Sequence, residues 1–168
     1  MLFRSPDGLS ADMMSLFYKR VCDIAATSDH SHRKIKVTFN GQQVPIKNFQ
    51  QYVDMYIGKS SAAVESSKRV YEEASDRWEY AVSLSPTHQF EQISFVNGIC
   101  THKGGKHVDY LIGQICRKLS AYIEKKKKIV VNANTIKEQL ILFLRCDIEN
   151  PAFDSQTKDY MNKIGRAH

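Results

Sequence analysis

Apolar residues recur at steps of three and four positions in two long segments, and this spacing predicts two amphipathic helices. The first segment follows Ser10, a residue type that caps helix N-termini, and is expected to run to about Ala26. The second covers residues 107–125 and follows the pair Gly104-Gly105. The predicted apolar faces comprise Met13, Leu16, Phe17, Val21, Ile24 and Ala25 in the first helix, and Val108, Leu111, Ile112, Ile115, Cys116, Leu119 and Ile123 in the second.

A hairpin is predicted after the first helix. Apolar and polar residues alternate over residues 35–39, and Asn40-Gly41 then provides the residue pair typical of a two-residue turn. Residues 44–46 form the expected second strand, and Pro45 within it indicates a position at a sheet edge.

Three further apolar patterns predict the strands of a larger sheet. Residues 78–84 alternate cleanly, residues 92–97 form another strand, and the short gap around Pro86 favours antiparallel pairing of the two. Residues 140–148 are apolar nearly throughout, which favours a buried central strand. The chain is therefore expected to be α+β, with a mixed sheet of about four strands backed by the two long helices.

Shorter segments complete the prediction. A helix is expected from Asn48 to a stop at Gly58, and residues 135–138 have the form of a capping box that begins one helical turn. Residues 59–67 are expected to form a loop. The polar stretch 27–33 also favours a loop over a metal site, although it holds His30 and His32.

Composition limits the class of protein. The 168 residues, 42% of them hydrophobic, suffice for one domain that buries roughly 70% of its unfolded surface. No apolar run approaches the ~18 residues of a membrane span. Four widely spaced cysteines are expected to be reduced, mostly buried thiols of an intracellular protein. A net charge of +6 suits an anionic partner such as nucleic acid.

Two stretches carry candidate chemistry. After the apolar run and Pro151, Gln156 offers an amide, and Lys158 offers a compact ammonium that suits a phosphate oxygen. Lys125 to Lys128 form the strongest charge run, which by itself is typical of a solvated helix end. Gly104-Gly105 before a helix has a form that can cradle an anion, although a plain turn is the favoured interpretation.

Four sequence words occur in a recognisable order: FNGQQVPIKNFQQYVDMY, ISFVNG, GGKHVD and ENPAFDSQTK. They resemble the transducer domain in the ATPase region of eukaryotic-type DNA topoisomerase II, over residues 9–162. The resemblance implies a single domain of the ribosomal protein S5 domain 2-like fold. Residues 1–8 and 163–168 are then expected to be flanking or added residues of an excised piece.

The resemblance also implies roles for the two candidate stretches. Lys158 would reach the terminal phosphate of ATP and Gln156 would position that contact, while ATP and Mg²⁺ are held by a preceding GHKL ATPase domain. Lys125, Lys126, Lys127 and Lys128 would contact DNA within a homodimer. In this chain Ile129 follows the four lysines at once, which departs from the family pattern of further Gly and Lys residues.

The implied function is the coupling of ATP hydrolysis to DNA strand passage. The chain shows neither ATP-holding motifs nor the tyrosine segment that cuts DNA, so it is expected to be inactive alone and to carry no bound cofactor. The implied location is the nucleus, with another DNA-containing compartment or a virus as the alternative. The alternative function is a freestanding basic nucleic-acid-binding module with no ATP role.

Overall fold

The computed structural model describes residues 8–28, 35–58 and 68–164. Internal contacts divide the chain into two compact units, Met1–Tyr52 and Val53–His168. The expected loops that hold His30, His32 and residues 59–67 lie outside the described residues.

The first unit is built on helix α1, Ala11–Thr27. Ser10 caps it as predicted, because its side chain accepts a hydrogen bond from the backbone of the first turn at 3.2 Å. The helix buries a carboxylate, Asp23, which accepts a hydrogen bond from the Tyr52 hydroxyl at 2.6 Å and pairs with Lys19 at 2.7 Å. These partners offset the cost of removing the charge from water.

The apolar face predicted for α1 is only partly buried, so that prediction is corrected. The helix packs through small side chains, which let a neighbouring segment approach closely, and the larger apolar side chains remain in solvent. Buried positions are Cys22, Ala25 and Ala26, whereas Met13, Leu16, Phe17 and Ile24 are between 39% and 56% exposed.

The predicted hairpin forms, with shorter strands than expected. Strands β1 (Thr38–Phe39) and β2 (Gln42–Gln43) pair around Asn40-Gly41, whose φ angles of 49° and 79° produce the tight turn. The expectation of a second strand at residues 44–46 is wrong. That segment contributes buried side chains to the core of the unit, and pairing stops one residue earlier.

Helix α2, Phe49–Ile57, spans the boundary between the two units. Asn48 accepts a hydrogen bond from the Gln51 amide at 2.9 Å, and Gly58, with φ of 79°, ends the helix as predicted. In the second unit, Tyr56 of α2 packs edge-on against Phe143 with ring centroids 5.6 Å apart.

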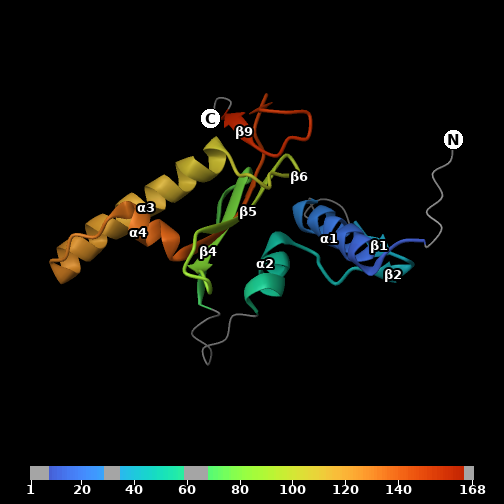
Figure 1. Ribbon diagram of the computed structural model, residues 1–168, viewed down its shortest axis with the longest axis horizontal. Coiled ribbons are helices and arrows are strands. Elements are labelled where there is room, and N and C mark those ends of the chain that lie inside the picture. Colours follow the sequence, from blue (N-terminus) through green and yellow to red (C-terminus); the bar gives the residue numbers. More distant parts are fainter. Residues whose placement is uncertain (1–7, 29–34, 59–67, 165–168) are drawn as a thin grey trace. The chain divides into compact units, whose positions relative to one another are not determined.

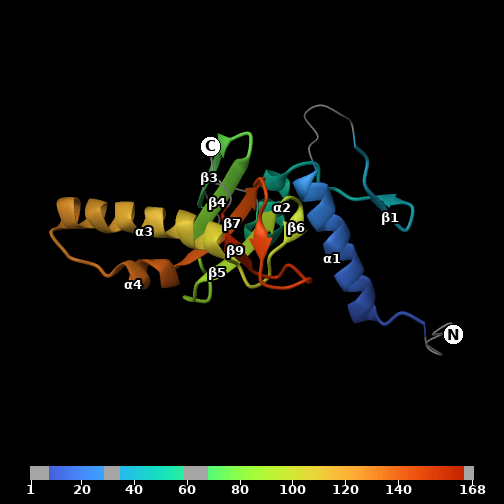
Figure 2. The same cartoon turned by 90° about the horizontal axis from the view of Figure 1, so that it is seen from above.

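The second unit contains a five-stranded mixed sheet in the order β3-β4-β7-β5-β6. Strand β7 lies in the middle, antiparallel to β4 and parallel to β5 (Figure 2). This confirms the predicted central strand, and Leu142, Phe143 and Leu144 are fully buried. The strands are β3 (Arg69–Ser75), β4 (Trp78–Leu84), β5 (Glu91–Val96), β6 (Ile99–Cys100) and β7 (Leu140–Cys146).

The predicted direct pairing of β4 with β5 is wrong, because β7 lies between them. A strand that is apolar on both faces must be covered on both faces and flanked on both sides, so it displaces the sequence neighbours from each other. The sheet has five strands where about four were expected. Strand β3 at one edge carries Glu72 and Glu73 in place of an apolar face, which is typical of an edge strand.

Helices α3 (Lys106–Lys127) and α4 (Ala133–Glu138) lie side by side and cover one face of this sheet (Figures 1 and 2). The prediction for α3 is confirmed, whereas α4 starts from the cap Asn132, because Asn132 Oδ1 accepts from the amide two residues on. The expected capping box at residues 135–138 is therefore wrong. The helix and the sheet share one buried apolar cluster. It contains Val108, Ile112 and Cys116 of α3 and Leu142, Leu144 and Cys146 of β7.

A two-stranded hairpin, β8 (Ala152–Phe153) and β9 (Met161–Lys163), meets the N-terminal end of α3. The Met161 amide donates to the Gly104 carbonyl at 3.2 Å, and Gly105, with φ of 144°, lies against the Met161 backbone. A Cβ at Gly105 would lie 2.5 Å from the Met161 carbonyl oxygen. The glycine pair therefore serves the close approach of two backbones, which supports the plain turn interpretation.

Gly105→Ala is expected to lower the free energy of unfolding by about 2–4 kcal/mol, because the added methyl meets backbone and the φ angle is disfavoured for alanine. Gly113→Ala is the matched control, since nothing lies within 4 Å of its Cβ in α3. That change should be neutral or stabilising by up to about 1 kcal/mol. Urea unfolding of both variants measures the difference, and equal stabilities would contradict the proposed close approach.

Candidate functional site

Gln156 and Lys158, which the sequence singles out, lie between β8 and β9. The connection between these strands, residues 154–160, is called the tip loop. The Asp154 amide donates to the Tyr160 carbonyl at 3.1 Å and closes the base of the loop. Inside it, the Lys158 amide donates to the Ser155 carbonyl at 3.1 Å. Lys158 itself has φ of 60°, the left-handed region that residues with a Cβ seldom adopt.

Short polar side chains hold the tip loop together. The Ser155 and Thr157 hydroxyls lie 2.8 Å apart, and the Thr157 hydroxyl donates to Asp159 Oδ2 at 3.0 Å. Lys103, in the turn before α3, approaches the same carboxylate oxygen at 3.7 Å. The loop is thus an internally bonded turn that a second element of the fold contacts.

The two side chains that the sequence singles out differ in exposure. Gln156 is exposed, and Lys158 is half-buried with its Nζ 5.8 Å from the centroid of the Phe153 ring. At this distance the ring attracts the ammonium weakly. A cation of this kind, on a loop of fixed backbone, can meet an anionic oxygen that approaches from outside the chain.

A buried polar network supports the turn between β6 and α3, which contains Lys103. Thr101 Oγ1 lies 2.5 Å from Ser94 Oγ and 3.1 Å from Nε2 of the fully buried His107. Gln92 Nε2 donates to the carbonyls of Thr101 and His102. Burial lowers the pKa of His107 from 6.5 to about 4, so at neutral pH this side chain is an uncharged core group.

The lysine cluster, Lys125 to Lys128, lies at the opposite end of α3. Lys125, Lys126 and Lys127 occupy the last helical turn, and Lys128 ends the helix in left-handed backbone with φ of 58°. All four side chains are exposed. Because they lie at the C-terminal end of α3, their positive charges are beside the negative end of the helix dipole. Lys126 also donates to the Tyr122 hydroxyl at 2.7 Å.

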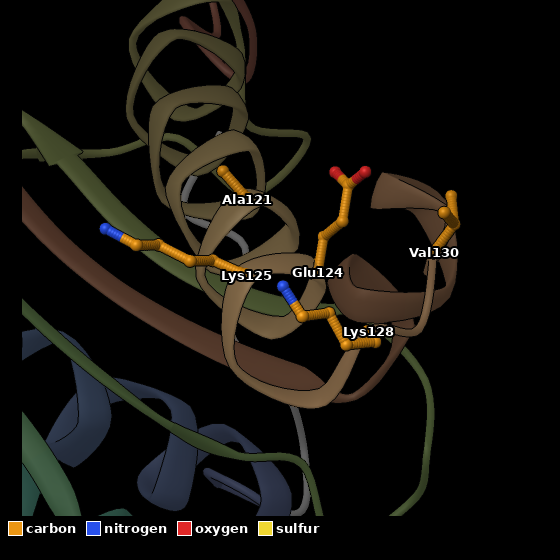
Figure 3. A pocket seen from close by; sticks show the side chains of 5 residues that line it. All are labelled: Ala121, Glu124, Lys125, Lys128 and Val130. Carbon is orange, nitrogen blue, oxygen red and sulfur yellow. The ribbon is translucent and has the colours of Figure 1, made fainter.

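The cluster borders a shallow depression lined by five side chains from the helix end and the following loop. Figure 3 shows that Lys125 extends away from the other four side chains, which are Ala121, Glu124, Lys128 and Val130. The lining thus carries two positive charges and one negative charge next to an exposed apolar residue. The arrangement presents cations to solvent and offers no enclosed cavity.

The structure brings Gln156 and Lys158 into one loop and keeps the lysine cluster away from them. Between them runs α3, whose 22 residues span about 33 Å. The C-terminal half of α3 extends beyond the sheet (Figure 2). The two candidate surfaces therefore occupy the two ends of one helix.

The sequence reasoning missed the contribution of Lys103 and Asp159 to the tip loop. Asp159 directly follows the word ENPAFDSQTK and Lys103 directly precedes GGKHVD, but only the fold brings the two together. In residues 8–28, 35–58 and 68–164, no group of three or more potential metal ligands is found, and no helix is long and apolar enough to cross a membrane.

Comparison with known sequences identifies relatives. A family model described as DNA gyrase B matches residues 48–166. DNA topoisomerase 2 of Arabidopsis thaliana is 46% identical over 154 residues, which cover 90% of this chain and 10% of the relative. DNA topoisomerase 2-alpha of Homo sapiens is 42% identical over 156 residues, which cover 91% of this chain and 10% of the relative. The chain spans about a tenth of the length of these relatives.

Solved structures share the fold. The ATPase region of Saccharomyces cerevisiae topoisomerase II matches with a TM-score of 0.79 at 37% identity, over 93% of this chain and 37% of that one. The ATPase and transducer domains of DNA topoisomerase II from Balamuthia mandrillaris match with a TM-score of 0.76 at 33% identity. The match covers 91% of this chain and 36% of that chain.

His107 is expected to make stability depend on pH. Its pKa is lowered in the folded state, so the unfolded chain takes up a proton first as the pH falls, and stability drops between about pH 6.5 and pH 4. The loss from this group is about 3 kcal/mol. His107→Gln should remove that part of the slope, as measured by urea unfolding at several pH values. An unchanged slope would show that His107 does not stay neutral.

Proposed function

The chain belongs to the DNA gyrase B family, and from this membership we propose that it is the transducer domain of an ATP-dependent type II DNA topoisomerase. In this role it couples ATP binding and hydrolysis in an adjacent GHKL domain to DNA strand passage. The observation that carries the proposal is the presentation of Lys158 at the tip of a fixed loop whose supporting hairpin contacts the start of α3.

Lys158 is proposed to contact the terminal phosphate of ATP, with Gln156 positioning that contact. The donor chemistry fits, because a compact ammonium with three donors and an amide both suit phosphate oxygens. ATP and Mg²⁺ are held by the adjacent domain, and this chain supplies a cation across the domain boundary. No bound cofactor is proposed for the chain by itself.

Two interaction energies decide whether the Lys158 ammonium stays at the Phe153 ring or moves to such a phosphate. An exposed ammonium over an aromatic ring gains about 0.5–1 kcal/mol. A unit charge pair at ~4 Å gains about 1 kcal/mol in water and about 4 kcal/mol at an effective dielectric constant of 20. The contact with phosphate therefore exceeds the resting contact only where closure of the domains excludes water.

The lysine cluster is proposed to contact DNA. Four exposed lysines at a helix end that extends beyond the sheet can reach a backbone of phosphates without rearrangement of the core. The contact is electrostatic and independent of base sequence, because ammonium groups address phosphates and not base edges.

Helix α3 is proposed to link the two surfaces. Its N-terminal end lies against β9 of the hairpin that carries Lys158, and its C-terminal end carries the lysine cluster. A continuous helix transmits a displacement of one end to the other, since a sharp kink would disrupt its backbone hydrogen bonds. A shift of the tip loop on meeting ATP would thereby move the lysines against DNA.

The proposed partners are DNA, the GHKL ATPase domain of the same chain, and a second copy in a homodimer. The exposed large apolar residues of α1 support an interaction with a further domain, because exposed apolar surface is used in contact sites. The proposed location is the nucleus, which follows from the eukaryotic relatives.

Lys158→Ala is expected to lower ATP turnover of the full-length protein by roughly 10³-fold, by analogy with cationic residues supplied to phosphoryl transfer from outside the nucleotide site. Lys118→Ala, which removes an exposed lysine of α3, is the control and should turn over like the wild type. Steady-state ATP hydrolysis measures both. Wild-type turnover of Lys158→Ala would rule out the assignment and favour the alternative, a freestanding nucleic-acid-binding module without an ATP role.

Replacing Lys125, Lys127 and Lys128 by Gln is expected to weaken duplex DNA binding and to make it less sensitive to salt. The slope of log affinity against log salt should become shallower by about 3 between about 50 and 200 mM salt. Fluorescence anisotropy with the 168-residue chain gives this slope. The matched control replaces three exposed lysines elsewhere, Lys68, Lys118 and Lys163, and should keep the wild-type slope. Equal slopes for the two triple variants would mean that binding is diffuse and not centred on the cluster.

A further inference from the structure

Asp159, which follows Lys158 directly, ties the tip loop to another element of the fold. Its carboxylate Oδ2 accepts a hydrogen bond from the Thr157 hydroxyl at 3.0 Å and lies 3.7 Å from the Lys103 ammonium. Its backbone carbonyl accepts a hydrogen bond from the Lys103 amide at 3.0 Å. Lys103 lies in the turn between β6 and α3, so these contacts connect both sides of Lys158 to the start of α3.

The backbone of Lys158 lies between the two residues that this carboxylate connects. Thr157 precedes it and Asp159 follows it, while Lys158 has the disfavoured φ of 60°. A residue with a Cβ keeps such a conformation only where its surroundings hold it. The direction in which the Lys158 side chain leaves the loop therefore depends on the bonded neighbours.

Stability alone does not account for these contacts. The Lys103 side chain is 69% exposed, and an ion pair of this kind contributes little to the free energy of folding. The loop closes at its base through backbone hydrogen bonds that do not involve the Asp159 side chain. The carboxylate thus acts locally, on the conformation of the loop tip.

We propose that Asp159 is a positioning residue for Lys158, and that its carboxylate, held between the Thr157 hydroxyl and the Lys103 ammonium, sets the direction of the Lys158 side chain toward the phosphate. The proposal rests on the proposed function, in which Lys158 contacts the terminal phosphate of ATP. Asp159 touches no substrate in this role and acts only through its neighbour.

The test measures ATP turnover of the full-length protein with Asp159→Ala, with Lys158→Ala and with both changes. Asp159→Ala should lower kcat roughly 10-fold and leave KM for ATP within about 2-fold, because misplacing a reacting group by ~1 Å costs up to about 10²-fold while the groups that bind ATP lie in another domain. In the Lys158→Ala background, the same change should have no further effect, since the group that it positions is gone.

Two more variants separate positioning from a folding defect. Asp159→Asn keeps an acceptor for the Thr157 hydroxyl and loses the charge that faces Lys103, so its kcat should lie between those of the wild type and Asp159→Ala. Asp76→Ala removes an exposed carboxylate from the turn between β3 and β4 and should turn over like the wild type.

The outcomes distinguish this proposal from the one on which it rests. If Lys158→Ala turns over like the wild type, both the proposed function and the positioning role fail. If Lys158→Ala loses turnover but Asp159→Ala does not, the positioning role is overturned and the proposed function stands. Equal losses from Asp159→Ala with and without Lys158 also overturn it, because they would show a general structural effect.

Discussion

The contact between Gly105 and the backbone of Met161 is the constraint on which the two candidate surfaces depend. No side chain fits between the two backbones, so the start of α3 and the hairpin that carries Lys158 are held at a fixed separation. The amide of Met161 and the carbonyl of Gly104 close the same junction with a hydrogen bond. Motion of the hairpin must therefore either carry α3 with it or break this junction, and breaking it leaves backbone groups without partners.

The position of α3 follows from the central strand. Strand β7 is apolar on both faces and pairs in parallel with β5, and a parallel pair requires a long crossover between its strands. That crossover includes β6, α3 and α4, and α3 packs its apolar stripe on β7. Because only the N-terminal half of α3 is needed to cover the sheet, the C-terminal half is free to extend and to carry the lysine cluster away from the core.

The tip loop illustrates how weak interactions can define a geometry. Each hydrogen bond among Ser155, Thr157 and Asp159 is exposed and contributes little to folding. Together they fix a backbone conformation that Lys158 would not adopt in a free chain. The proposed transducer role would use this combination, because Lys158 then has a defined starting direction and a weak resting contact with Phe153.

Several features of the fold followed from local rules and were predicted from sequence. The cap at Ser10, the Asn40-Gly41 turn, the stop at Gly58 and the α3 helix each depend on a few adjacent residues, whose preferences act over short distances. Strand order did not follow. The sequence marked β7 as a buried central strand, but the separation of β4 from β5 by β7 also required knowledge of where the crossover returns. The exposed face of α1 and the cap at Asn132 likewise depend on neighbours that periodicity does not specify.

The candidate site was likewise predicted from the sequence only in part. By itself, the sequence determined the chemistry, an amide and an ammonium at Gln156 and Lys158 and four adjacent positive charges from Lys125 to Lys128, because charge and donor type belong to the residues. Only the tertiary structure decided that these groups occupy opposite ends of one helix, and that Lys103 reaches Asp159 from 56 positions away in the numbering. Such relations arise when chain segments that are distant in sequence pack together, and no local pattern records them.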